Sequence, residues 1–63
     1  EINIKENSIH IKKYIEIQDI KNDQIIIKLK NNKLIIKGNN IIINKMDEYE
    51  ILMHGIIKGI EIE

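Results

Sequence analysis

The residues that could carry chemistry are few and lie far apart in the sequence. The two histidines are His10 and His54, and the only serine is Ser8. A zinc site needs three or four ligands at characteristic spacings, and neither histidine has such a spacing to a second ligand. Ser8 lacks the flanking glycines of a nucleophile elbow. We therefore expect neither a metal site nor a serine nucleophile.

The acidic group Asp47, Glu48 and Glu50 is the best candidate for a pair of catalytic carboxylates. A solvated loop explains this group more simply, because runs of charge usually face water. A hydrolase that uses these carboxylates is the weakest of three functional hypotheses. We expect no enzyme and no cofactor.

One local basic patch consists of Lys28, Lys30, Lys33 and Lys37. A solubilising surface is its simplest interpretation, and the alternative is a domain that binds an anionic polymer such as cell-wall glycan or nucleic acid. Ten lysines balance ten acidic residues. Zero net charge argues against general nucleic-acid binding, whose affinity comes mostly from phosphate neutralisation. We expect no nucleic-acid partner, since Tyr14 and Tyr49 are the only aromatic residues that could stack on bases.

Hairpins are predicted to position these lysines. Asn31-Asn32 and Gly38-Asn39 are typical of two-residue turns. The first turn places Leu34 opposite Leu29 and Ile36 opposite Ile27. The second turn places Ile36 opposite Ile41 and Leu34 opposite Ile43. Side chains alternate between the faces of a strand. One face is then entirely apolar and consists of Ile25, Ile27, Leu29, Leu34, Ile36, Ile41 and Ile43. The other face consists of Ile26, Lys28, Lys30, Lys33, Ile35, Lys37, Asn40, Ile42 and Asn44.

The second face carries an apolar stripe, Ile26, Ile35 and Ile42, among the four lysines. Another part of the chain or the lysine stems could cover this stripe. The alternative is a surface that docks a protein partner.

The remaining segments also predict strands. With a turn at Glu6-Asn7, residues 1–11 form a hairpin in which Ile4 faces Ile9 and Ile2 faces Ile11. Residues 50–63 predict two short strands around Gly55 and Gly59, and a glycine bulge would reconcile their conflicting alternation. Gly55 and Gly38 lack the context of a phosphate-binding loop, so we assign both to turns or bulges.

The fold predicted for residues 1–63 is a single small all-β domain. Its antiparallel meander would form a β-sandwich, roll or partly open barrel of six to eight short strands without a helix. No apolar run exceeds three residues, so we expect no transmembrane segment within these residues. A domain of 63 residues without cysteine has only a small core, so we expect a homo-oligomer. The first functional hypothesis is a non-enzymatic assembly or adaptor domain that binds itself or a partner through an exposed sheet edge or through the stripe of Ile26, Ile35 and Ile42.

The order of these segments resembles the YabP/YqfC family of sporulation proteins from endospore-forming Firmicutes, and the YqfC branch in particular. The resemblance covers nearly the whole chain and is carried by LIIKGNNI (34–41) and EILMHGIIKGIEIE (50–63). Asn31-Asn32 departs from the family, whose members often have Gly there, and Ile41 replaces a family Leu. No catalytic residues carry over. The resemblance implies a role in spore formation in the mother-cell cytoplasm. It also implies a membrane-embedded sporulation protein as partner, with membrane association through that partner.

Overall fold

The computed structural model describes residues 2–63, which form six antiparallel strands in one sheet. The strands are β1 (Ile2–Lys5), β2 (Ser8–Lys12), β3 (Glu16–Ile20), β4 (Gln24–Lys28), β5 (Lys33–Met46) and β6 (Glu50–Ile62). Their order in the sheet is β1-β2-β6-β5-β4-β3. The prediction of a small antiparallel all-β fold without a helix is confirmed. No helix occurs in the described residues, and so none there could span a membrane.

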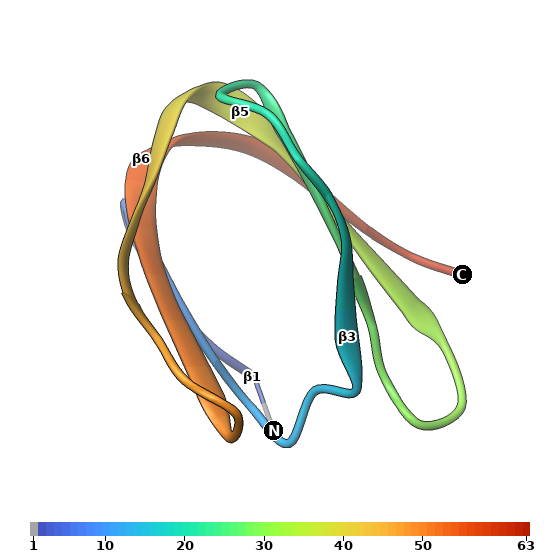
Figure 1. Ribbon diagram of the computed structural model, residues 1–63. Coiled ribbons are helices and arrows are strands. Elements are labelled where there is room, and N and C mark those ends of the chain that lie inside the picture. The colour runs from blue at the N-terminus through green and yellow to red at the C-terminus, as the bar shows by residue number, and fades with distance from the viewer. Residues whose placement is uncertain (1) are drawn as a thin grey trace.

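The two longest strands, β5 and β6, pair with each other and bend together, so that the sheet folds back as an arch (Figure 1). The bend divides the sheet into two halves. The β1–β2 half contains β1, β2, residues 50–54 of β6 and residues 42–46 of β5. The β3–β4 half contains β3, β4, residues 33–37 of β5 and residues 59–62 of β6. The result is an open roll whose inner face is enclosed by two halves of one sheet.

Close backbone contact at the bend explains two of the glycines. A Cβ on Gly38 would lie 2.0 Å from the carbonyl oxygen of Ile56, and a Cβ on Gly55 would lie 2.7 Å from that of Asn40. Gly55 also has φ of 153° and Asn40 has φ of 53°. Only glycine adopts the first conformation readily, and asparagine tolerates the second better than most residues.

The predicted turn at Gly38-Asn39 is therefore wrong. These residues lie inside the continuous strand β5, where Gly38 pairs with Ile57 and Asn39 with Ile56. Gly and Asn were correctly associated with an unusual backbone, but that backbone is a bend. The pairs predicted across this turn, such as Ile36 with Ile41, do not form, because both residues of each pair belong to β5.

The core lies on the inner face of the roll and draws on both halves. Its buried residues are Ile9, Ile11, Ile25, Ile27, Leu34, Ile36, Ile41, Ile51 and Met53, all of them 0% exposed except Ile41 at 6%. Leu29 and Ile43 pack against this cluster and are partly buried. All seven residues of the predicted apolar face therefore belong to or contact the core.

The hairpin registers were predicted with mixed success. In the first hairpin Ile2 pairs with Ile11 and Ile4 with Ile9, as predicted. In the second, the amide of Leu29 donates to the carbonyl of Asn32 at 2.8 Å. The turn is thus centred on residues 30–31, one residue before the predicted Asn31-Asn32. Ile27 consequently pairs with Leu34 and Ile25 with Ile36, a shift that keeps every side chain on its predicted face.

The C-terminal segment forms one strand where the sequence predicted two. β6 runs through Gly55 and Gly59, so Gly55 lies at a bend and not in a turn. Lys37 pairs with Gly59 and Gly38 with Ile57, which leaves Lys58 as an extra residue opposite β5. This bulge brings Ile60 and Ile62 to the inner face together with Ile51 and Met53, so a bulge does reconcile the two alternation patterns.

Candidate protein-binding face

The outer face of the β3–β4 half has two isoleucines at its centre. Ile26 on β4 pairs directly with Ile35 on β5, on the side of the sheet opposite the core. Their chain neighbours Ile25 and Ile36 are fully buried on the inner side, whereas Ile26 and Ile35 are only partly buried. We call this surface the outer face.

Acidic residues flank the isoleucine pair on both sides, across the strands. Asp19 of β3 pairs with Ile26, and Glu61 of β6 pairs with Ile35. The central row of the outer face therefore reads Asp19, Ile26, Ile35, Glu61. A carboxylate lies at each end of this row, with an apolar centre between them.

Lysines flank the same isoleucine pair along the strand direction. Lys28 and Lys33 pair with each other in the row toward the 29–32 turn, with Glu16 beyond Lys28. The amide and carbonyl of Lys33 exchange hydrogen bonds with those of Glu63 at 2.7 and 2.8 Å, which completes this row. The row on the other side of the isoleucines contains Gln24 and Lys37.

Exposed ion pairs link some of these charges. Lys37 Nζ lies 3.1 Å from Glu61 Oε1, with about half of each side chain exposed, and Lys21 Nζ lies 3.9 Å from Asp19 Oδ2. Exposed pairs of this kind contribute little to stability. In residues 2–63 no ion pair within 4.0 Å includes Lys28 or Lys33. Two like charges directly opposite each other on neighbouring strands are unfavourable.

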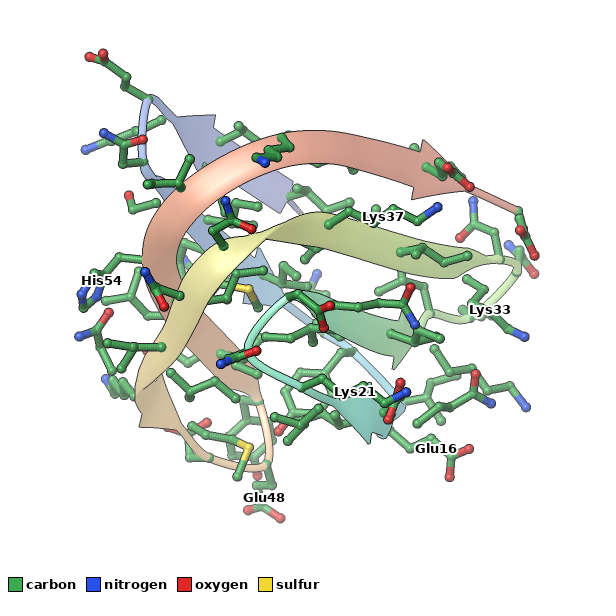
Figure 2. All side chains as sticks on the ribbon, turned by 90° about the horizontal axis from the view of Figure 1, so that it is seen from above. Glu16, Lys21, Lys33, Lys37, Glu48 and His54 are labelled. Carbon is green, nitrogen blue, oxygen red and sulfur yellow. The ribbon has the colours of Figure 1, made fainter. Side chains whose placement is uncertain are left out.

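The structure separates Ile42 from the other two members of the predicted stripe. Ile42 lies beyond the bend and pairs with His54 in the β1–β2 half. Figure 2 shows His54 at one side of the molecule and Lys33 and Lys37 at the other. The stripe across three strands is therefore wrong, because it depended on the turn at Gly38-Asn39. Ile26 and Ile35 remain together.

Three of the four predicted lysines lie on the outer face, and Lys30 lies in the adjoining turn. Lys28, Lys30 and Lys33 line one shallow depression of about 430 Å³, together with Glu63. A second depression of about 320 Å³ is lined by Lys21, Lys37 and Lys58, together with Asp23. Each depression thus contains a carboxylate as well as its lysines, so neither is uniformly basic.

Two residues of the acidic group make polar contacts within the β5–β6 hairpin. Asp47 Oδ1 accepts the amides of Tyr49 and Glu50 at 2.8 and 2.9 Å, and these bonds lower the pKa of the Asp47 carboxyl. Glu50 Oε1 lies 2.8 Å from Lys45 Nζ, which lowers the pKa of Glu50 and raises that of Lys45. These contacts explain Asp47 and Glu50 as parts of a turn. The third carboxylate, Glu48, lies at the periphery of the molecule (Figure 2).

The two histidines lie on the outer side of the β1–β2 half. His10 Nε2 is 3.5 Å from Glu50 Oε2, and His54 shares a hydrogen bond with Asn44. Ser8 lies two residues before His10, and both line a shallow depression of about 310 Å³ with Asn3 and Leu52. Among residues 2–63 no group of three His, Cys, Asp or Glu side chains is arranged to hold a metal ion.

The sequence missed the acidic flanks of the outer face. Asp19 and Glu61 are 42 positions apart. They belong to one row because β6 lies beside β5 and because a bulge between Ile17 and Asp19 brings Asp19 opposite Ile26. The signal that could have indicated this was the change of alternation within residues 50–62, which fits one long strand with a bulge beside β5.

The sequence also missed the exposed inner-face residues at the sheet edges. Ile4 on β1, Ile20 on β3 and Ile62 on β6 are 56%, 52% and 63% exposed, although their pairing partners are buried. They are exposed because the roll is open between its two halves.

Comparison of the chain with protein-family models, curated proteins and solved structures gives no match. The kinship with the YabP/YqfC family stays a prediction from the sequence.

Proposed function

We propose that this chain is a non-enzymatic assembly or adaptor domain of endospore formation, which binds a protein partner through its outer face. The observation that carries the proposal is the directly paired Ile26 and Ile35, bordered by carboxylates across the strands and by lysines along them. An apolar centre inside a polar rim is the usual composition of a protein–protein interface.

The mixture of charges favours a protein partner over a polymer of one charge. Glu16, Asp19, Glu61 and Glu63 surround the lysines of this face, and a polyanion would meet these carboxylates as well. A folded protein can present both signs of charge at matching positions.

The sporulation role follows from the resemblance to the YabP/YqfC family. On that basis we propose that the domain acts in the mother-cell cytoplasm and docks to a membrane-embedded sporulation protein. Membrane association would then be indirect, through the partner.

The test is an affinity capture from sporulating cells with the unsubstituted chain and the Ile35→Lys variant. We expect the unsubstituted chain to capture a sporulation membrane protein and the Ile35→Lys variant to lose it. The captured protein should also bind the unsubstituted chain when the two are purified and mixed. Ile56→Lys is the matched control, since Ile56 is exposed at the bend and lies outside the outer face. Equal capture by all three chains would contradict the proposal.

A second candidate function is binding of an anionic ligand such as cell-wall glycan or nucleic acid. The depression shared by Lys28, Lys30 and Lys33 favours it. Such binding would weaken steeply with salt, and Lys30→Gln would weaken it without affecting Ile26 or Ile35. Salt-independent binding, or no binding of teichoic acid, peptidoglycan fragments or oligonucleotides, would exclude this candidate.

A further inference from the structure

The charges of the outer face form a cross around the isoleucine pair. Across the strands, Asp19 and Glu61 each lie one and a half strand spacings from the centre, which is about 7 Å. Along the strands, Lys28 and Lys33 on one side and Lys37 on the other each lie two residues from the isoleucine pair, which is also about 7 Å. Negative and positive arms therefore have the same length and lie at right angles to each other.

Such a face has charges complementary to those of a second copy when the two faces are stacked with their strands at right angles. Placing the face on a copy with parallel strand directions sets lysines against lysines and carboxylates against carboxylates. Placing it with the strands at right angles sets each lysine arm against a carboxylate arm and keeps the isoleucines in contact at the centre. Near-perpendicular crossing is one of the two common arrangements of packed sheets.

We propose that the partner of the outer face is a second copy of this chain, packed with its strands at right angles about a two-fold axis. The axis lies along the diagonal of the face that runs from Glu16 past the isoleucine pair. This proposal rests on the proposed function: a second copy occupies the outer face until the sporulation partner binds there in its place.

The two-fold operation defines which charges meet. Lys28 and Lys33 of one copy face Asp19 of the other, and Lys37 faces Glu61. At the corners away from the axis, Lys21 faces Glu63. Glu16 lies on the axis and faces Glu16 of the other copy, which is the one like-charge contact of this arrangement. Because a two-fold interface is isologous, every one of these pairs occurs twice. Lys28 and Lys33, which repel each other within one chain, thereby gain a carboxylate between them.

The expected association is weak because the face is small. Four strands and five residues of each strand, with their side chains, cover about 400 Å² per copy, half of what a standard stable interface buries. We expect a Kd of about tens to hundreds of micromolar, because interfaces of this size belong to weak, transient complexes.

The test is sedimentation equilibrium of purified chains from about 10 μM to 1 mM, a range chosen to bracket that affinity. An acid-to-lysine variant, Asp19→Lys with Glu61→Lys, places lysines on all four arms and should raise the Kd by roughly tenfold or more. A lysine-to-acid variant, Lys28→Glu with Lys33→Glu and Lys37→Glu, should do the same. Mixing the two variants should restore association as a heterodimer.

The matched control is Glu6→Lys with Glu48→Lys, which changes charge equally on exposed residues outside the outer face. Its Kd should stay within about twofold of that of the unsubstituted chain, since distant exposed charges are screened. Circular dichroism checks that every variant keeps its strands.

A monomer at 1 mM, or failure of the mixed variants to associate, would overturn the second-copy proposal. The adaptor function would survive that result if the unsubstituted chain still captures the sporulation partner and the Ile35→Lys variant does not. A dimer without any captured partner would instead contradict the adaptor function alone.

Discussion

Ile26 and Ile35 lie directly opposite each other on β4 and β5, on the side of the sheet that faces away from the core. One position earlier and one position later along the two strands, Ile25 and Ile36 form the same kind of pair on the inner side and are fully buried. Identical side chains one residue apart therefore serve different purposes. The inner pair holds the roll together, and the outer pair is available to a partner.

This difference predicts opposite outcomes for two neighbouring substitutions. Ile36→Lys removes a fully buried side chain, which costs about 2–5 kcal/mol, and buries an ammonium group in addition. A domain of this length has a free energy of unfolding of about 3–9 kcal/mol, so we expect Ile36→Lys to unfold it. Ile35→Lys should cost about 1 kcal/mol and weaken association. Urea titration followed by circular dichroism compares them, and equal behaviour would show the face assignment to be wrong.

The bend predicts a contrast between two glycines of β5 and β6. Gly38→Ala would place a methyl group 2.0 Å from the Ile56 carbonyl oxygen, which the backbone must move to accommodate. We expect a loss of about 3 kcal/mol or more. Gly59→Ala is the control, because a Cβ there has nothing within 4 Å. It should be neutral or stabilising by about 0.5 kcal/mol, and thermal unfolding of both variants measures the difference.

The hairpin turn predicts a loss of stability at both ends of the pH scale. The pKa of Asp47 lies below its ordinary 3.8 and that of Glu50 below 4.5. Their contribution is complete above about pH 4.5 and is lost as the pH falls through the folded-state pKa values. The pKa of Lys45 lies above its ordinary 10.5, so its contribution is complete below that pH and is lost as the pH rises through the folded-state value.

Urea titrations between pH 2.5 and 7 test the acidic limb. We expect Glu50→Gln to flatten the decline in unfolding free energy, because the carboxylate bound by Lys45 is absent. Glu48→Gln is the control, since no ion pair within 4.0 Å in residues 2–63 includes Glu48. Identical pH profiles for the two variants would show that the Lys45–Glu50 pair does not contribute.

A strained residue at the end of the first hairpin offers a stabilising substitution. Lys13 has φ of 62°, and its amide donates to the Tyr49 carbonyl at 2.8 Å. Asparagine tolerates this left-handed conformation better than lysine does. Lys13→Asn should therefore raise the free energy of unfolding by about 0.5–1 kcal/mol and the Tm by several degrees. Lys5→Asn, in an exposed strand, should not raise it.

Local pattern was sufficient for the first hairpin and for the two faces. Ile2, Ile4, Ile9 and Ile11 pair as their alternation predicted. The turn near Asn31 was misplaced by one residue, but the faces were still right because that error shifts the partners by two. Alternation survives such shifts, so it predicts burial better than it predicts pairing.

The path of the chain after Ile36 could not be predicted locally. Gly38, Asn39 and Asn40 have the composition of a tight turn, and the bend uses the same permissive backbone. What decides between turn and bend is the strand that pairs with residues 38–46. That strand is β6, whose residues pair from 5 to 19 positions further along the chain, and the bend residues Gly38 and Asn39 pair 19 and 17 positions away. The position of Glu61 on the outer face depended on the same non-local pairing, whereas that of Asp19 depended on a bulge between Ile17 and Asp19 in β3.

Methyl-labelled isoleucine tests the central claim most directly, because the chain has 20 isoleucines distributed over both faces and both edges. Two-dimensional methyl spectra recorded at increasing protein concentration report which side chains enter an interface. We predict concentration-dependent shifts for Ile26 and Ile35 and constant positions for Ile42 and the buried Ile9 and Ile11. Shifts confined to the edge residues Ile4, Ile20 and Ile62, or no shifts at any concentration, would contradict the account.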